Sequence, residues 1–145
     1  MELISKTFDQ LTTSELYEIL KARAEIFVVE QNCLYQDMDD IDYRSLHIFY
    51  WEDGKVHAYL RAFEQAPGGD VIRFGRVLTV RHGMGLGGKL LREAIRIIRE
   101  ETSARKLFIE SQCHAIGFYE REGFCICSEE FMEVGIPHVA MELEL

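Results

Sequence analysis

A glycine-rich stretch, HGMGLGGKLL at residues 82–91, is the part of the sequence whose composition most directly implies chemistry. Its four glycines lead straight into an amphipathic apolar pattern. The first amides of a helix have no partner within that helix and attract anions, and glycine lets a phosphate approach them closely. Because each extra glycine costs roughly 0.5–1 kcal/mol in ordering entropy, we interpret the stretch as a phosphate-binding loop at a helix start.

Two common phosphate-binding motifs match the glycine spacing but lack what else their chemistry requires. The Walker A spacing is met, yet Leu90 stands where a hydroxyl must hold magnesium. A dinucleotide-binding pattern runs from Gly83 to Gly88, and Glu110 lies where a ribose-binding acid belongs. That fold needs repeated strand–helix–strand units, whereas hairpin strands precede the loop and only 35 residues follow Glu110. A nicotinamide-dependent oxidoreductase is therefore a weaker hypothesis.

The first half of the chain supplies a helix and a hairpin to support this loop. Thr12 followed by Glu15 is a capping-box signature, and apolar residues at helical spacing extend the helix to about Val28 or Glu30. The polar segment 31–45 is expected to be a loop or a short irregular helix. The stretches LHIFYW and VHAYLRAF, separated by EDGK, predict two antiparallel strands joined by a tight turn.

The second half predicts one parallel crossover within an otherwise antiparallel sheet. A strand from Val71 to Val80, the glycine loop, a helix and the strand Lys106 to Glu110 make a right-handed strand–helix–strand unit. HAIGFYEREGF predicts a short helix stopped by Gly123, and the remaining residues predict closing strands. The expected fold class is α+β, with a central mixed, mostly antiparallel sheet flanked by helices, in a single domain over residues 1–145.

Composition narrows the range of partners and compartments. The net charge of the 145-residue chain is −9, which opposes a nucleic-acid partner. A signal sequence and a long apolar run are both lacking, so we expect a cytoplasmic protein with no membrane partner. The four cysteines are expected to be reduced. We expect Cys125 and Cys127 to pack in the core and Cys113 to be a buried, inert thiol.

Three segments together resemble the GCN5-related N-acetyltransferases (GNAT superfamily). The family's loop signature is Q/R-x-x-G-x-G/A, which this chain follows except that His82 stands at the first position, beside Arg81. The segment SQCHAIGFYEREGF resembles a later family motif whose tyrosine falls on Tyr119. The stretches LYEILKARAEIFVVEQNCLYQDMDD, GRV and GIPHVAME are similar to the small bacterial ElaA-type branch. The resemblance covers nearly the whole chain.

The resemblance implies that the ligand of the glycine loop is acetyl-CoA or coenzyme A. In the family, the pantetheine arm lies along a splayed strand like an added strand, which here implies Val77, Leu78 and Thr79. The diphosphate is expected on the loop, assisted by the positive end of the following helix and by Lys89 and Arg92. The loop residues expected to hold it are His82, Gly83, Met84, Gly85, Leu86, Gly87 and Gly88.

Acetyl transfer requires a proton acceptor for the amine and a proton donor for the departing sulfur. An alkyl ammonium has a pKa of about 10.4, so a base must generate the nucleophile at neutral pH. Tyr119 is the expected acid. Glu30, at the end of the first helix, is our assignment for the base, and Glu110, His47 and His138 remain alternatives. Each of these four also fits a role as a solvated carboxylate or a partly buried ring.

The acceptor site is predicted from polar residues in the same segments. The resemblance places Arg23 and Gln112 there, with Glu30, His47 and His138 as further substrate-binding candidates. The acidic run comprises Asp37, Asp39, Asp40 and Asp42. It departs from a calcium loop because Ile41 and Asp42 stand where a ligand and a glycine are needed, so no metal is expected. We interpret the run as an acidic lip that attracts a cationic amine, with simple solvation as the alternative.

The sequence therefore predicts an acetyl-CoA-dependent N-acetyltransferase that acts on the amine of a small molecule or peptide by direct attack on the thioester. The alternative is a non-catalytic acyl-CoA-binding or interaction module on the same fold. Two features depart from the family pattern and leave this alternative open: His82 itself, and the connection from Val77 to His82, which is shorter than the family's usual strand-to-loop connection. Members of this family often form dimers, so a homodimer is a further expectation.

Overall fold

The computed structural model of the chain describes residues 1–145 and centres on an eight-stranded sheet. The strand order is β1-β2-β3-β4-β5-β8-β6, and β7 pairs with β8. The strands are β1 (Glu2–Thr7), β2 (Leu46–Glu52), β3 (Lys55–Glu64), β4 (Val71–Thr79), β5 (Lys106–Gln112), β6 (Cys125–Ile126), β7 (Phe131–Glu133) and β8 (Ile136–Glu144). Only the β4–β5 pair is parallel, which confirms the predicted α+β class with one crossover.

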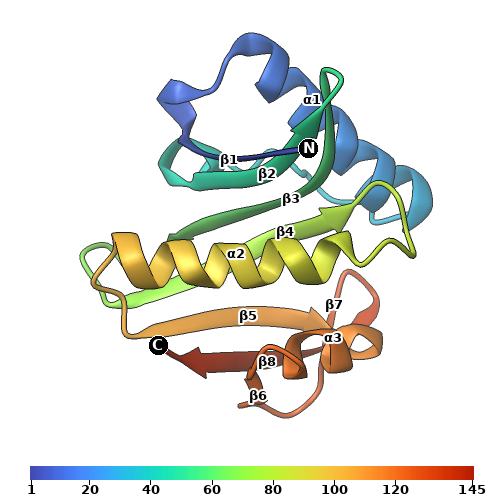
Figure 1. The fold of residues 1–145 in the computed structure, drawn as a ribbon. Helices are drawn as coiled ribbons and strands as arrows, with labels where there is room; N and C mark the ends of the chain where they lie inside the picture. The colour runs from blue at the N-terminus through green and yellow to red at the C-terminus, as the bar shows by residue number, and fades with distance from the viewer.

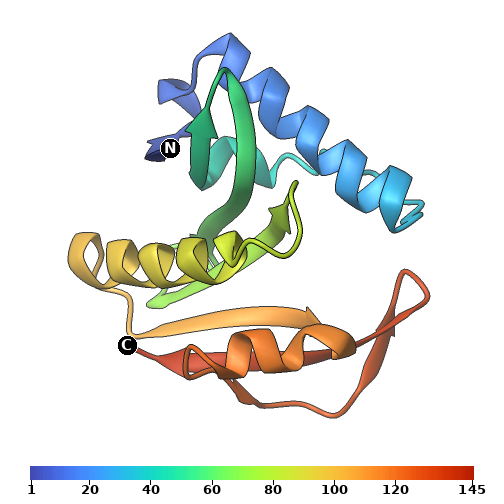
Figure 2. The same cartoon turned by 45° about the vertical axis from the view of Figure 1, so that its right-hand side comes forward.

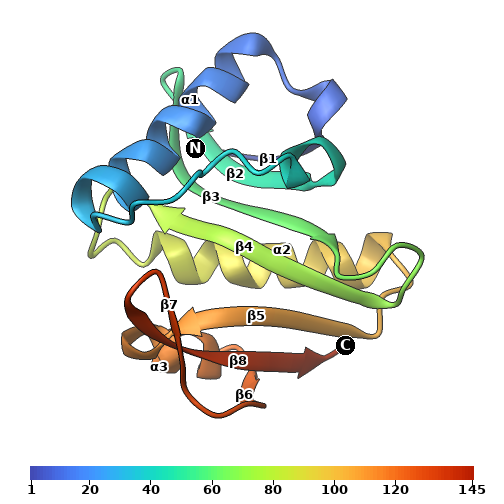
Figure 3. The same ribbon diagram turned by 180° about the vertical axis from the view of Figure 1, so that it is seen from behind.

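Helices cover both faces of the sheet (Figures 1 and 3). On one face lie α2 (Leu86–Glu101) and α3 (Ile116–Glu120), and on the other lies α1 (Thr13–Arg23). Alternate residues of the central strands face opposite ways. Ile48 of β2 therefore packs in the core beneath α2, while its neighbour Phe49 packs beneath α1. Burial on both faces explains why these strands read as almost continuous apolar runs.

The first helix begins and ends where the sequence predicts. Thr12 and Glu15 form a reciprocal capping box, with Glu15 N–H donating to Thr12 Oγ1 at 3.1 Å and Thr12 N–H donating to Glu15 Oε1 at 2.8 Å. Glu15 also accepts from Lys6 Nζ at 3.0 Å, which ties the helix start to β1. Beyond Arg23 the chain continues as a π-helical segment, Ala24–Glu30, so the helical path does reach Glu30.

The crossover opens a gap in the sheet. The parallel ladder joins β4 and β5 only from Val71–Arg73 to Lys106–Phe108. Past this point the two strands diverge toward the glycine loop (Figure 2). The β3–β4 register also shifts, because Arg61 lies opposite Gly75 while Tyr59 lies opposite Leu78. This shift marks a β-bulge in β4.

The cysteine predictions are only partly correct. Cys33 is buried and Cys113 is half-buried, and all four thiols are free. Cys125 and Cys127 are exposed, so the prediction that they pack in the core is wrong. Cys125 belongs to β6, a two-residue strand at the edge of the sheet whose residues are both exposed, and Cys127 follows that strand directly. Separately, every helix in the structure is too short or too polar to cross a membrane.

We predict that Thr12→Ala lowers the free energy of unfolding by about 1 kcal/mol, because the Glu15 amide loses its capping oxygen. The measurement is a urea unfolding curve. Thr13→Ala is the matched control, since Thr13 is exposed and makes no side-chain cap. Equal losses in the two variants would contradict the assignment of Thr12 as the cap.

Candidate active site

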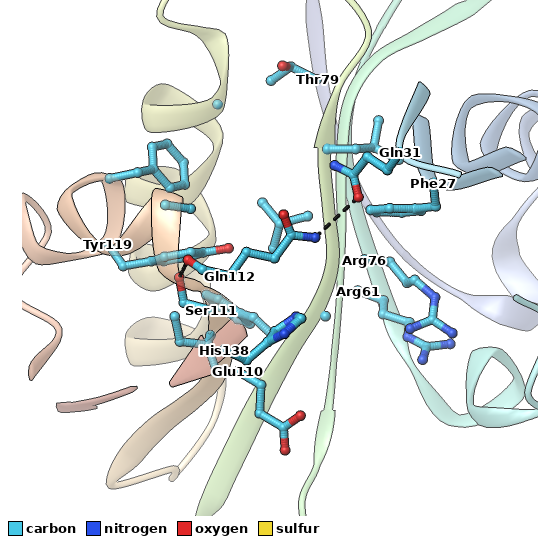
Figure 4. A pocket seen from close by; sticks show the side chains of 18 of the residues that line it. Phe27, Gln31, Arg61, Arg76, Thr79, Glu110, Ser111, Gln112, Tyr119 and His138 are labelled. Atoms are coloured by element: carbon cyan, nitrogen blue, oxygen red, sulfur yellow. Dashed lines mark hydrogen bonds between the residues drawn. The ribbon is translucent and has the colours of Figure 1, made fainter. Parts of the chain in front are cut away.

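A cleft of about 990 Å³ lies where β4 and β5 part. Its walls come from β4, the glycine loop, β5, α3, the end of the first helix and the turn before β8. Figure 4 shows Tyr119 and Gln112 on one side of the diverging strand, with Arg61 and Arg76 across it. Tyr119 of α3 and Phe27 of the segment after α1 both line the cleft, so it reaches both faces of the sheet.

The glycine loop forms one end of the cleft and presents free backbone donors. Gly85 is the N-cap of α2, with φ +68° and no side-chain cap. Lys89 N–H donates to Gly85 at 3.2 Å and is the first α2 amide with a backbone partner. The three preceding amides, of Leu86, Gly87 and Gly88, are therefore open to an anion. All seven predicted loop residues line the cleft, namely His82, Gly83, Met84, Gly85, Leu86, Gly87 and Gly88.

The neighbouring part of β4 presents an unpaired strand edge. Val77, Leu78 and Thr79, which the resemblance implies bind the pantetheine arm, all line the cleft. Leu78 pairs with β3 on one side, but the ladder to β5 has already ended on the other. Backbone groups on that open side can bind an extended ligand in the manner of an added strand.

Tyr119 enters the cleft from α3. The residue is 8% exposed, and its hydroxyl makes no hydrogen bond within the protein. Its ring packs edge-on against Phe118 and Phe124, at centroid distances of 4.9 and 5.8 Å. Burial raises the pKa of the phenol above its ordinary value. At neutral pH the hydroxyl is therefore protonated and has a proton to donate.

Three predicted polar residues meet on the β5–β8 side of the cleft. Gln112 lies opposite His138 in the β5–β8 register, and Glu110 lies two positions before Gln112 on the same face. Gln112 Nε2 donates to Gln31 Oε1 at 3.2 Å across the cleft (Figure 4). All four side chains line the cleft, so the structure brings Gln112, His138 and the alternative base Glu110 together.

Glu30 lies elsewhere, and this position does not support our assignment of it as the base. Its carboxylate oxygen is 3.1 Å from His82 Nε2, at the outer side of the glycine loop. Both side chains are substantially exposed, and Glu30 is not among the residues that line the cleft. The π-helical segment therefore places the Glu30 side chain against the glycine loop.

Arg23 and His47 are buried structural residues, so their prediction as substrate contacts is wrong. Arg23 has no exposed surface, and neither residue lines the cleft. His47 Nδ1 lies 2.7 Å from the Tyr59 hydroxyl, and Nε2 lies 2.9 Å from the Asp42 carbonyl oxygen. Both ring nitrogens are therefore used within the protein. Burial lowers the pKa of His47 and keeps the ring neutral.

The predicted acidic lip is instead a set of ion pairs. Arg23 binds Asp42 at 2.6 Å and Asp37 at 2.9 Å. Arg61 binds Asp39 at 2.7 Å and Asp42 at 3.0 Å. Arg76 completes the set by binding Asp37 at 2.8 Å. The charge of these carboxylates is thus compensated within the protein, and of the acidic run only Asp40 stands outside the arginine–aspartate network.

The arginine–aspartate network was the largest feature missed from the sequence. Arg61 and Arg76 lie on β3 and β4, next to the bulge, and both line the cleft. Arg76 has a left-handed backbone, with φ 52°, which is uncommon for a residue other than glycine. The sequence did contain a signal for this network, because arginines occur in strands that are otherwise apolar. A buried arginine requires a carboxylate partner.

The positive charges expected beside the loop divide between two environments. Arg92 lines the cleft and pairs with Glu122 at 3.3 Å. Lys89 does not line the cleft, and its ammonium lies 5.4 Å from the centre of the Tyr50 ring. Arg92 therefore lies beside the cleft, where an added positive charge was expected. Lys89 does not, because its ammonium points toward β2.

Comparison with known sequences identifies a family. The model of a family described as an acetyltransferase (GNAT) domain matches residues 11–145. A UPF0039 protein of Schizosaccharomyces pombe is 38% identical over 149 residues, which cover 100% of this chain and 98% of that protein. Protein ElaA of Escherichia coli is 31% identical over 140 residues, covering 94% and 92%. The resemblance to the ElaA-type branch is confirmed.

Solved structures agree with the sequence relatives. The crystal structure of an acyl-CoA N-acyltransferase from Pseudomonas aeruginosa is similar, with a TM-score of 0.91 and 33% identity, covering 98% of this chain and 99% of that one. The crystal structure of Escherichia coli ElaA gives a TM-score of 0.90 and 29% identity, with the same coverage of 98% and 99%.

The arginine–aspartate network predicts a loss of stability in acid. Burial opposes ionisation of Asp39, but the hydrogen bonds and charge of Arg61, with Arg76, outweigh it and lower the pKa from 3.8 to about 2. A carboxyl whose pKa is depressed by folding stabilises the folded state above its unfolded pKa, and this contribution is lost as pH falls through the folded value. The free energy of unfolding should therefore fall between about pH 4 and pH 2.

Asp39→Asn should be less stable than the parent at pH 7 and should show a smaller decline over that acid range. Urea unfolding at several pH values measures both effects. Asp40→Asn is the matched control, since Asp40 is an exposed neighbour without a cationic partner. An unchanged acid dependence in Asp39→Asn would show that other carboxylates carry it.

Proposed function

This chain belongs to the acetyltransferase (GNAT) family, and on that premise we propose that it transfers an acetyl group from acetyl-CoA to the amine of a small molecule. Membership establishes acyl-CoA-dependent acyltransferase chemistry in general. The observation that carries the finer proposal is the cleft at the parting of β4 and β5, which holds free amides, an open strand edge and an unbonded phenol in one continuous site.

The residues present fit acetyl-CoA. The free amides of Leu86, Gly87 and Gly88 would hold the diphosphate at the positive end of α2. Gly87 lets the start of α2 pack closely on β4, because a Cβ there would lie 3.1 Å from Thr79 Cγ2. The edge of β4 at Val77–Thr79 would hold the pantetheine arm. When bound, acetyl-CoA supplies an acetyl group already activated as a thioester.

Tyr119 is the proposed acid for the departing sulfur. Its hydroxyl is unbonded within the protein, and burial keeps it protonated well above neutral pH. A neutral phenol beside a nascent thiolate can donate its proton as the carbon–sulfur bond breaks. The acceptor amine would enter from the face covered by α1, where Gln112 and His138 line the cleft.

The glycine loop can be tested with two matched glycines. Gly85 and Gly54 have φ +68° and +69°, and a Cβ at either would meet nothing within 4 Å. Alanine at each site should cost about 1–2 kcal/mol of left-handed strain and lower the melting temperature alike. Only Gly85→Ala should also weaken acetyl-CoA binding, by about tenfold or about 1.4 kcal/mol, because a shift of the strained turn moves the α2 amides that would hold the diphosphate.

Calorimetry with acetyl-CoA and with S-acetylpantetheine completes this test. The pantetheine compound lacks the diphosphate and should bind the parent far more weakly than acetyl-CoA does. Absence of acetyl-CoA binding at millimolar concentration would remove the proposed function. Tight binding without transfer to any amine of a broad panel would instead favour a non-catalytic acyl-CoA-binding module.

We predict that Tyr119→Phe lowers kcat by about 100-fold or more while the Kd for acetyl-CoA and the melting temperature stay unchanged. The hydroxyl makes no internal hydrogen bond, so its removal leaves packing intact. Steady-state kinetics and calorimetry measure the two effects. Tyr50→Phe is the matched control, because Tyr50 is buried in the same core but does not line the cleft. Unchanged turnover in Tyr119→Phe would assign the acid role to water or another residue.

A further inference from the structure

A charged cluster lies in the cleft beside the proposed acceptor entrance. Ile109 of β5 packs in the core beneath α2, so its neighbour Glu110 points to the opposite face. Glu110 pairs with Arg73 of β4 at 3.0 Å. Glu133 of β7 and His138 of β8 complete the cluster, and all four residues line the cleft. Figure 4 shows the His138 ring between Glu110 and Gln112.

The hydrogen bonds of His138 fix which ring nitrogen carries the proton. Nδ1 lies 2.7 Å from the carbonyl oxygen of Ile136, and a carbonyl can only accept, so Nδ1 donates. In the neutral ring, Nε2 therefore has a free lone pair. The nearest carboxylate oxygen, on Glu133, is 3.8 Å from Nε2, which is longer than a hydrogen bond. A buried imidazole with one nitrogen fixed and the other unused is suited to accept a proton from a ligand.

The charged groups around this ring favour a positive ligand. Glu133 of β7 lies nearest to its Nε2, and Phe131 stacks on it at 6.0 Å between ring centroids. Glu110 of β5 lies beside Glu133 and pairs with Arg73 of β4. Burial and the neighbouring Glu110 carboxylate raise the pKa of Glu133. With Arg73 paired to Glu110, a cation beside Glu133 would relieve the remaining repulsion between the two carboxylates.

We infer that Glu133, Glu110 and His138 form a subsite for an alkyl ammonium, and that His138 Nε2 accepts the proton that makes this acceptor a nucleophile. The inference rests on the proposed function and deepens it by naming the substrate class. The two carboxylates exclude acceptors with an acidic group beside the amine, because that group would be repelled.

The proton and electron balance follows from these positions. His138 Nε2 takes one N–H proton from the ammonium, and the nitrogen lone pair so released forms the C–N bond with the acetyl carbon. The C–S bond breaks, the sulfur receives the proton of the Tyr119 hydroxyl, and the second proton of the amine nitrogen returns to the Tyr119 phenolate, which leaves a neutral amide. The positive charge moves from the ammonium to the imidazolium and stays beside Glu133, so the carboxylate acts as a positioning residue for both states.

Nuclear magnetic resonance of the imidazole nitrogens tests the subsite without any turnover. In the parent, His138 should show a protonated Nδ1 and a bare Nε2, and titration with n-butylammonium should shift its signals. Glu133→Gln should weaken this binding by about tenfold or more, equivalent to at least 1.4 kcal/mol. Glu129→Gln is the matched control, since Glu129 is exposed in the same segment and does not line the cleft.

Kinetics with n-butylamine test the base. His138→Gln should lower kcat/KM at pH 7 by about 100-fold or more with no change in the Kd for acetyl-CoA. The deficit should shrink as pH approaches the amine pKa of about 10.4, because free amine no longer needs a base. A merely structural role for His138 would give the same deficit at every pH.

Three results would overturn the inference. They are an Nε2-protonated His138, n-butylammonium binding that is absent or indifferent to Glu133→Gln, and a His138→Gln deficit that does not change with pH. Failure of the proposed function gives a different pattern, in which the parent binds acetyl-CoA and n-butylammonium yet acetylates no amine. That pattern overturns the base role together with the function and leaves the ammonium subsite.

Discussion

The site depends on the early end of the parallel ladder between β4 and β5. Hydrogen bonds join the strands over three residue pairs, and the strands then separate. An unpaired backbone edge inside a sheet is costly unless another group satisfies it, so the opening is a natural place for an extended ligand. The same opening connects the two faces of the sheet. Tyr119 reaches it from the α3 face, and Glu110 and His138 reach it from the other.

The arginine–aspartate network fixes the far wall of this opening. Asp37, Asp39 and Asp42 come from the loop after the first helix and bind arginines of α1, β3 and β4. Burying such charges is expensive, and it is tolerated only where each has a well-placed partner. Because the network compensates its own carboxylates and Arg73 pairs with Glu110, the remaining carboxylate on the proposed acceptor side is that of Glu133. The loop after the first helix therefore shapes the entrance, while β7 supplies this carboxylate.

Features made by residues close in the chain were predictable. The Thr12 capping box, the hairpin around EDGK and the glycine loop each depend on contacts within a few residues, and the structure contains all three. The crossover was equally accessible, because a strand, a helix and a strand in succession have one favoured handedness. Contacts between residues far apart in the chain were not predictable. The ion pairs of Arg23 with the aspartates form only in the folded chain, so the sequence does not show that these charges are paired. Cys125 lies in a strand at the edge of the sheet, and an alternating pattern looks the same in an edge strand and in a central strand.

By itself, then, the sequence determined the α+β architecture and the half of the cleft proposed to bind the acyl donor, because backbone amides at a helix start and a neighbouring strand are positioned by local geometry. Only the tertiary structure brought together the residues of the proposed acceptor half. Glu110, Glu133 and His138 come from β5, β7 and β8, and they meet because antiparallel pairing brings these strands together. Which carboxylates are paired depends on residues that are close in space but distant in the sequence. Spacing along the chain therefore does not reveal the pairing.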